Sequence, residues 1–278
     1  MDATALKAQQ HATWTGAAPG WRRHDARLAG ITRSVSERLI AELRPGQRVL
    51  DIACGTGEPA LPAAERVGPT GYVLATDFVA EMVAFAREKA VARGLANIEF
   101  RHVDGECLEV PEASFDAVTM RWGLMFMPDP VACLVRARAA LKPGGAVSLA
   151  CWCGPERNPW ASIPLAVMKR HVELPAVAPG APGIFAFAER GLLEQTLAAA
   201  GFKDVRLDEH ALVMSEFASG ADYVDFTLEV AGPVAQLIAQ LPAETWAVVR
   251  REIEQAAEEP TGGGVRLTGV TWIARARV

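Results

Sequence analysis

The chain has 278 residues, half of them hydrophobic, a formal net charge of −5 at pH 7 and a pI of about 5.6. This length allows one domain with additions or two small ones. The acidic balance and the lack of a basic stripe argue against a nucleic-acid partner, because phosphate contacts dominate that kind of affinity. No apolar run reaches the roughly 18 residues of a membrane span, so no membrane partner is expected.

The five cysteines are scattered, without a C-x-x-C pair or a histidine at metal-ligand spacing. We expect them to be reduced and mostly buried, as free cysteines usually are. Met1-Asp2 is not followed by the charged and apolar regions of a signal peptide. These features predict a cytoplasmic protein that holds no metal ion.

Residues 1–44 precede the regular part of the chain and are expected to form a helical or irregular arm. The arm contains Trp14 and Trp21, and a helical pattern runs from about Ser34 to Leu43. The pair Pro45-Gly46 ends this pattern.

Strands and helices alternate from residue 45 to residue 152. The segments with strand character are 48–53, 71–76, 98–103, 114–120 and 146–152. The intervening helical patterns, such as 79–93 and 130–141, imply right-handed crossovers and a parallel sheet. Continuous apolar strands are typical of burial on both faces.

The pattern changes after residue 152. Segment 153–187 is rich in Pro, Ala and Gly, and segment 188–214 returns to a helix and then a strand at 205–212. Segment 215–262 is mostly helical, and segment 263–278 holds a final strand at 269–278. We predict an α/β, Rossmann-like, doubly wound, mostly parallel seven-stranded sheet. Segments 153–187 and 215–262 are expected to be lid insertions over the carboxyl ends of the strands, where such sheets bind ligands.

A glycine loop follows the first strand, in the run Val49 to Gly57. Gly55 and Gly57 let the backbone approach a ligand without a Cβ clash. Asp77, twenty residues after Gly57, can accept hydrogen bonds from ribose hydroxyls. Gly55, Gly57 and Ala60 also fit the dinucleotide fingerprint. These residues alone therefore leave open an NAD(P)-dependent oxidoreductase and a non-catalytic protein that kept the cofactor fold.

Three more features decide between these classes: Asp51 closes the first strand, Asp104 follows the third, and Leu141 to Gly145 precede the fifth. With them, residues 45–152 resemble the class I S-adenosylmethionine-dependent methyltransferases, in the branch of the ubiquinone and menaquinone C-methyltransferases. The resemblance implies S-adenosylmethionine as cofactor and S-adenosylhomocysteine as product.

The resemblance also implies contacts to the methionine part of the cofactor. Asp51 and the backbone of Ala53, Gly55 and Gly57 would surround it. Ala53 stands where the family more usually has glycine, a departure that a backbone with negative φ tolerates. Arg121, just past the fourth strand, would lie beside the methionine carboxyl or the substrate.

The adenosine part would meet residues after the second and third strands. Asp77 would hold the ribose, while Phe78 and Met82 would pack against the adenine. Asp104 would accept from the adenine amino group, and the backbone of Gly105-Glu106 would meet the ring edge.

A methyl sulfonium is intrinsically reactive, so aligning the acceptor and excluding water can suffice for catalysis. A hydroxyl acceptor benefits from a general base, for which His24 and His171 are the better histidine candidates. Arg121 is a third weak candidate for a catalytic role. His102 and His210 lie in strand patterns and are expected to be packed there.

The acceptor class is indicated by Arg121-Trp122-Gly123-Leu124, which replaces the Asn/Asp-Pro-Pro-aromatic run of many nucleobase methyltransferases. Trp122, Phe126, Trp152 and Trp160 are candidates to wall an apolar pocket. We expect O- or C-methylation of a small, apolar or aromatic molecule, as in secondary metabolism. N-methylation of a small amine is the alternative, and a homodimer is left open.

Overall fold

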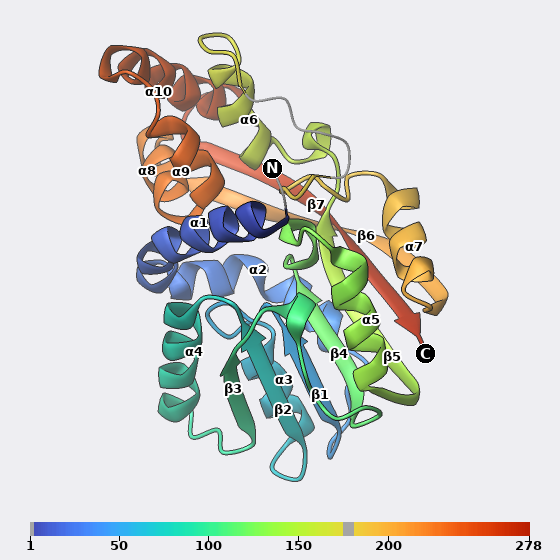
Figure 1. Ribbon diagram of the computed structural model, residues 1–278. Coiled ribbons are helices and arrows are strands. Elements are labelled where there is room, and N and C mark those ends of the chain that lie inside the picture. Colours follow the sequence, from blue (N-terminus) through green and yellow to red (C-terminus); the bar gives the residue numbers. More distant parts are fainter. Residues whose placement is uncertain (1–2, 175–180) are drawn as a thin grey trace.

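The structure, a computed structural model, describes residues 3–174 and 181–278. Residues 1–2 of the expected arm and 175–180 of the expected 153–187 insertion lie outside the described residues. Within the described residues, seven strands form one sheet in the order β3-β2-β1-β4-β5-β7-β6 (Figure 1). The strands are β1 Arg48–Ile52, β2 Tyr72–Asp77, β3 Ile98–His102, β4 Phe115–Arg121, β5 Leu141–Trp152, β6 Lys203–Phe217 and β7 Val265–Arg277. The first five strands run parallel, and β7 is antiparallel to both neighbours, which confirms the predicted mostly parallel, seven-stranded sheet.

Helices cover both faces of the sheet. On one face α3 (Ala60–Val67) and α4 (Ala80–Ala92) connect β1, β2 and β3, and on the other α5 (Pro130–Ala140) and α7 (Arg190–Ala199) pack beside β5 and β6. Right-handed crossovers that run in opposite directions from β1 produce these two layers. The carboxyl ends of β1 and β4 consequently meet where the chain changes direction.

The N-terminal arm is helical, which is one of the two forms, helical or irregular, that the sequence predicts. It forms α1 (Ala3–Arg23) and α2 (Asp25–Ile40), so the second helix begins nine residues before the expected Ser34. The apolar residues Leu28, Val35 and Leu39 of α2 recur at helical spacing and are buried against the sheet. In Figure 1, α1 crosses the molecule between α2 and α4 below it and the C-terminal helices above it.

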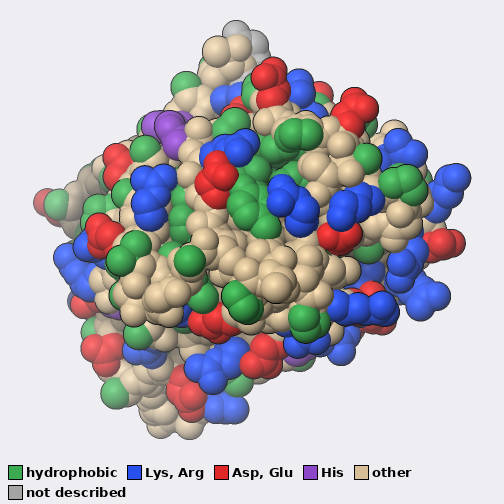
Figure 2. Space-filling model, turned by 90° about the horizontal axis from the view of Figure 1, so that it is seen from below, with side chains coloured by type: hydrophobic (Ala, Val, Ile, Leu, Met, Phe, Trp, Pro, Cys, Tyr) green, Lys and Arg blue, Asp and Glu red, His purple; other side chains and the backbone are tan. Residues whose placement is uncertain are grey.

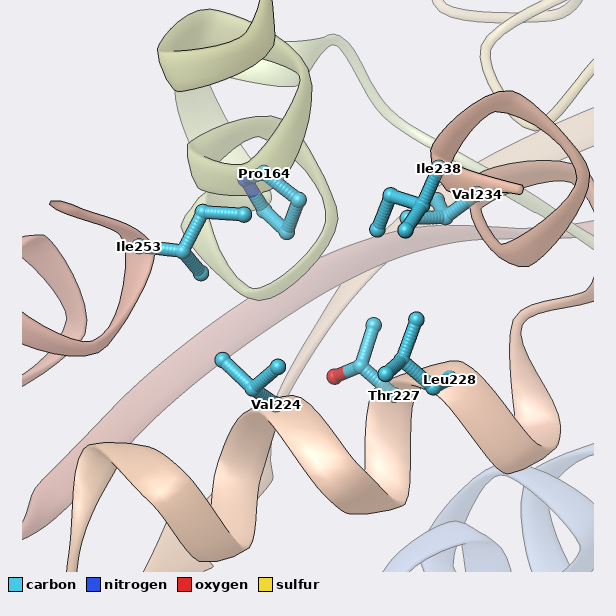
Figure 3. A pocket seen from close by; sticks show the side chains of 7 residues that line it. All are labelled: Pro164, Val224, Thr227, Leu228, Val234, Ile238 and Ile253. Carbon is cyan, nitrogen blue, oxygen red and sulfur yellow. The ribbon is translucent and has the colours of Figure 1, made fainter. Parts of the chain in front are cut away.

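Four helices gather on the extended ends of β6 and β7, at the top of Figure 1. They are α6 (Pro159–Met168), α8 (Gly220–Val230), α9 (Gly232–Ile238) and α10 (Ala243–Glu258). Their apolar side chains surround a cavity of about 10 Å³, shown in Figure 3, which is about the space of one water molecule. The two segments expected as lids therefore pack against each other closely. Their role as lids stays a prediction.

The structure corrects three strand boundaries. β5 begins at Leu141, which pairs with Phe115, and the register then shifts to Ala146 opposite Ala117, so residues 142–145 form an irregularity inside the strand. β6 and β7 extend well beyond the expected 205–212 and 269–278. Because the extended ends pair mainly with each other and are only half-buried, they lack the continuous apolar run that marks an interior strand.

Two features of the described residues bear on possible partners, the length of the apolar helices and the charge of the surface. No helix in the described part of the chain is long and apolar enough to cross a membrane. The face in Figure 2 carries acidic and basic side chains side by side.

Candidate active site

The glycine loop leads from β1 into α3 in a tight turn. The Cys54 amide donates to the Thr76 carbonyl at 2.9 Å and the Gly57 amide to the Cys54 carbonyl at 2.8 Å. Gly55 has a φ of 52° and Gly57 a φ of 102°, the left-handed region that favours glycine. A Cβ added to Gly55 would meet nothing within 4 Å, so the space beside this backbone is open to a ligand.

Ala53 corrects one expectation. Its φ is +58°, not negative, and this conformation is costly for a residue with a Cβ. The Ala53 side chain lies against the loop after β4, because a Cβ added to Gly123 would overlap the Cβ of Ala53. The two loops at the carboxyl ends of β1 and β4 are thus in direct contact, and Gly123 leaves the room that Ala53 occupies.

Asp51 is a buried carboxylate with one oxygen unused. Its Oδ1 accepts a hydrogen bond from Thr119 Oγ1 at 2.6 Å, whereas Oδ2 has no partner among the described residues. Burial raises the pKa of Asp51 to about 7. A cationic group at Oδ2 would satisfy this oxygen and stabilise the ionised form.

Asp77, the last residue of β2, ties the loops after β1 and β2 together. Its Oδ2 accepts from the Gly55 amide at 2.8 Å and its Oδ1 from the Val79 amide at 2.9 Å. Burial raises the pKa of Asp77, while these hydrogen bonds oppose the rise. A carboxylate accepts about four hydrogen bonds, so Asp77 keeps acceptor capacity for a ligand hydroxyl.

Asp104 and Glu106 lie just after β3. Asp104 Oδ1 accepts from the Glu106 amide at 2.9 Å, and Glu106 Oε1 accepts from the Asp129 amide at 2.9 Å. Both carboxylates also contact Lys7 of α1, Asp104 Oδ2 at 2.7 Å. The Gly105 backbone packs so tightly that an added Cβ would lie 2.8 Å from Ile52 Cγ2.

Helix α1 covers this part of the site, which the sequence interpretation missed. Trp14, Trp21 and Ala18 pack against Phe78 and against the buried Val79 and Met82 at the start of α4. The signal was present in the sequence, because the residues of this stripe recur at alternating spacings of four and three. They are Lys7, His11, Trp14, Ala18 and Trp21.

Arg121 is the last residue of β4, since its pairing with Ala150 extends the strand, rather than lying past the strand as expected. Its guanidinium is buried and donates to the hydroxyls of Thr32 and Ser36 in α2. Burial lowers the pKa of Arg121, against the opposing charges of Glu58 and Asp51. These contacts hold α2 against β4 beside the site.

Three of the four expected acceptor aromatics form one group. Trp122 stacks on Trp152 at 4.3 Å between ring centroids, and Trp152 lies 4.9 Å from Trp160. Trp122 Nε1 donates to Thr271 Oγ1 of β7 at 3.0 Å. Phe126 is apart from this group and packs against Trp14 of α1, at 4.9 Å.

Trp122 is also held in an unusual backbone conformation. Its φ is +57°, which costs a bulky residue of order 1–3 kcal/mol and is concentrated at functional sites. The residue directly follows β4, so its ring is positioned at the carboxyl edge of the sheet.

The two candidate histidine bases pair with glutamates of the C-terminal helices. His24 Nε2 lies 2.8 Å from Glu229 of α8, and His171 Nε2 lies 3.0 Å from Glu252 of α10. Neither contact joins a histidine to the glycine loop, and a catalytic role for either stays a prediction.

Comparison with known proteins decides the family. A family model described as a methyltransferase domain matches residues 49–145. Nocamycin O-methyltransferase of Saccharothrix syringae is 36% identical over 197 residues, which are 66% of this chain and 69% of that protein. The chain belongs to the methyltransferases.

One further relative agrees with this assignment, and one solved structure shows the same fold. The methyltransferase is 40% identical to a demethylmenaquinone methyltransferase of Geobacillus kaustophilus over 103 residues, which span only 44% of that relative. A crystal structure of a methyltransferase of Bacillus halodurans has the same fold, with a TM-score of 0.55 at 21% identity, covering 91% of this chain and 98% of that one. The methyltransferase uses S-adenosylmethionine, which ends the oxidoreductase alternative.

Proposed function

We propose that S-adenosylmethionine lies across the carboxyl ends of β1, β2 and β3. The unused Oδ2 of Asp51 fits the methionine ammonium, and the open side of Gly55 fits the chain that follows it. The free lone pairs of Asp77 fit the ribose hydroxyls. The orphaned buried oxygen of Asp51 carries this assignment, because a buried polar atom without a partner is costly unless a ligand satisfies it.

The adenine in this proposal lies between the start of α4 and the turn after β3. Phe78 and Met82 supply apolar contact, and Asp104 has acceptor capacity for the amino group. The Gly105-Glu106 backbone forms the floor, since Gly105 packs directly on β1.

The bound cofactor supplies an electrophilic methyl group on a cationic sulfur. The protein's part is to orient the acceptor and exclude water. The close contact between Ala53 and Gly123 fixes the relative positions of the cofactor loop and the loop that carries Trp122. The arrangement therefore favours catalysis by alignment.

We propose that the acceptor is a small, planar, largely apolar molecule methylated on oxygen or carbon. The stacked pair Trp122 and Trp152 supports this, because an indole face at the carboxyl edge of β4 can stack on a flat ring. The relative with the longest match reported above is named an O-methyltransferase, which favours oxygen over carbon.

The test is a panel of phenols, quinols and small amines, with methyl transfer from isotopically labelled S-adenosylmethionine followed by mass spectrometry. The position of the label separates O-, C- and N-methylation. Transfer to amines but to no phenol or quinol would overturn the proposed acceptor class and support the amine alternative.

A variant pair links the result to the aromatic group. Trp122→Ala should raise the KM for the acceptor about tenfold or more while leaving the Kd for S-adenosylhomocysteine within twofold, since stacked rings contribute on the order of 1 kcal/mol beyond the buried area. Trp122→Phe keeps a ring but loses the hydrogen bond to Thr271. Its KM for the acceptor should lie between those of the wild type and Trp122→Ala. An unchanged acceptor KM in Trp122→Ala would remove this residue from the acceptor site.

A further inference from the structure

Lys7 is the charged residue of α1 that reaches the proposed adenine end. Its Nζ lies 2.7 Å from Asp104 Oδ2 and also contacts Glu106 Oε2. The Lys7 and Asp104 side chains are each about one third exposed, while that of Glu106 is only 5% exposed. Burial opposes the ammonium, but its hydrogen bonds to Asp104 and Glu106 raise the pKa of Lys7 above the usual value. One cation thus bridges two carboxylates at the edge of the proposed adenine site.

The two halves of α1 are anchored differently. The C-terminal half is fixed to α8: Trp21 Nε1 donates to the Val230 carbonyl at 2.9 Å, and Gly20 lies so close that a Cβ would overlap the Glu229 carbonyl oxygen. Such backbone contact leaves that half little freedom. The N-terminal half, by contrast, meets the site through the side chains of Lys7 and of His11, whose ring lies 5.7 Å from Phe78. The anchored half begins at Thr13, because a Cβ added to Gly232 of α9 would lie 2.9 Å from the Thr13 carbonyl oxygen.

In this N-terminal half, Lys7 makes the charged contacts with the site. Asp104 is held on its other oxygen by the Glu106 amide, so the carboxylate cannot follow Lys7 if the helix moves away. A carboxylate accepts about four hydrogen bonds, so Asp104 can accept from Lys7 and from an adenine amino group together. The ion pair and the proposed cofactor contact are therefore compatible.

We propose that Lys7 is a cofactor-positioning residue: by bridging Asp104 and Glu106 it orients both carboxylates and holds the first half of α1 closed over the adenine. The proposal rests on the cofactor site proposed above. It implies that the cofactor leaves only when α1 opens, so weakening the bridge speeds dissociation.

The test compares Lys7→Gln, Lys7→Arg and a control, Lys142→Gln, in the full chain. Lys142 also pairs with an aspartate at 2.7 Å on a partly exposed surface, but with Asp116 at the opposite end of β4. Isothermal titration calorimetry and stopped-flow displacement give the Kd and the dissociation rate for S-adenosylhomocysteine. We expect Lys7→Gln to raise both roughly fivefold to tenfold, because the lost pair is charge-assisted but partly exposed. Lys7→Arg should restore most of the affinity, and Lys142→Gln should match the wild type.

Two further readouts separate positioning from general destabilisation. Hydrogen exchange in residues 3–12 should rise in Lys7→Gln and stay unchanged in Lys142→Gln. The wild-type dissociation rate should increase with salt more steeply than that of Lys7→Gln, because salt screens the pair.

Each outcome has a defined meaning. Wild-type affinity in Lys7→Gln would overturn the role of Lys7, and tighter binding would show instead that Lys7 competes with the adenine for Asp104. An Asp77→Ala variant is measured in parallel. If it too binds as the wild type does, the cofactor site itself is misplaced and the inference fails with it.

Discussion

The contact between Ala53 and Gly123 predicts a strong, measurable coupling between two single substitutions. Gly123 has φ −90° and ψ −45°, which alanine adopts readily, so its only obstacle is the Ala53 Cβ. Gly123→Ala forces the two Cβ atoms to overlap, and overpacking of this kind costs about 1–3 kcal/mol. Ala53→Gly relieves the cost of a left-handed alanine, about 1–2 kcal/mol, which raises the free energy of unfolding. It also gives the unfolded chain more conformational entropy, which lowers the free energy of unfolding by about 0.4–1 kcal/mol. Ala53→Gly alone should therefore be neutral or slightly stabilising.

The double variant distinguishes a contact from two independent effects. Without the Ala53 Cβ, the nearest atoms to a new Cβ at 123 are Met120 Cγ at 3.4 Å and Sδ at 3.6 Å, which is ordinary contact. Gly123→Ala should then cost nothing, or stabilise slightly by restricting the unfolded chain.

The expected coupling energy is about 2 kcal/mol or more. It is measured by urea unfolding of the wild type, both single variants and the double variant, at constant m-value. Additivity within about 0.5 kcal/mol would refute the direct contact.

Three other outcomes follow from the site. Because burial raises the pKa of Asp51 to about 7 from 3.8, its folded form holds a proton that the unfolded chain has lost, so this group should lower the unfolding free energy by about 3 kcal/mol as pH rises from 4 to 7. Asp51→Asn should remove that slope in pH-dependent unfolding, and a difference from wild type that does not grow with pH contradicts the assignment. The Kd of the wild type for S-adenosylhomocysteine should fall as pH rises through about 7, where Asp51 ionises, and calorimetry should show a flatter profile in Asp51→Asn. Asp77→Ala should weaken that binding at least tenfold, since hydrogen bonds to a charged acceptor contribute about 1.5–3 kcal/mol each; equal affinity in both proteins would exclude Asp77 from the site.

The sequence by itself determined the sheet and the family. Apolar runs alternating with helical patterns predict buried parallel strands, because a fully buried strand must be apolar on both faces. The glycine loop, Asp77 and Asp104 are local signals at strand ends, and all of them lie at the carboxyl edge of the sheet in the structure. Local patterns succeed here because crossover handedness brings strand ends together without further information.

Only the tertiary structure decided what depends on contacts between distant segments. The positive φ of Ala53 and its contact with Gly123, seventy residues away along the chain, appear only in the folded structure. Arg121 donates to Thr32 and Ser36 of α2, a contact that its position in the sequence does not show, and its predicted ligand contact stays a prediction. Lys7 reaches Asp104 across 97 residues. Periodicity shows which face of a helix is apolar, but it does not show what that face covers, because the partner surface is assembled only when the chain folds.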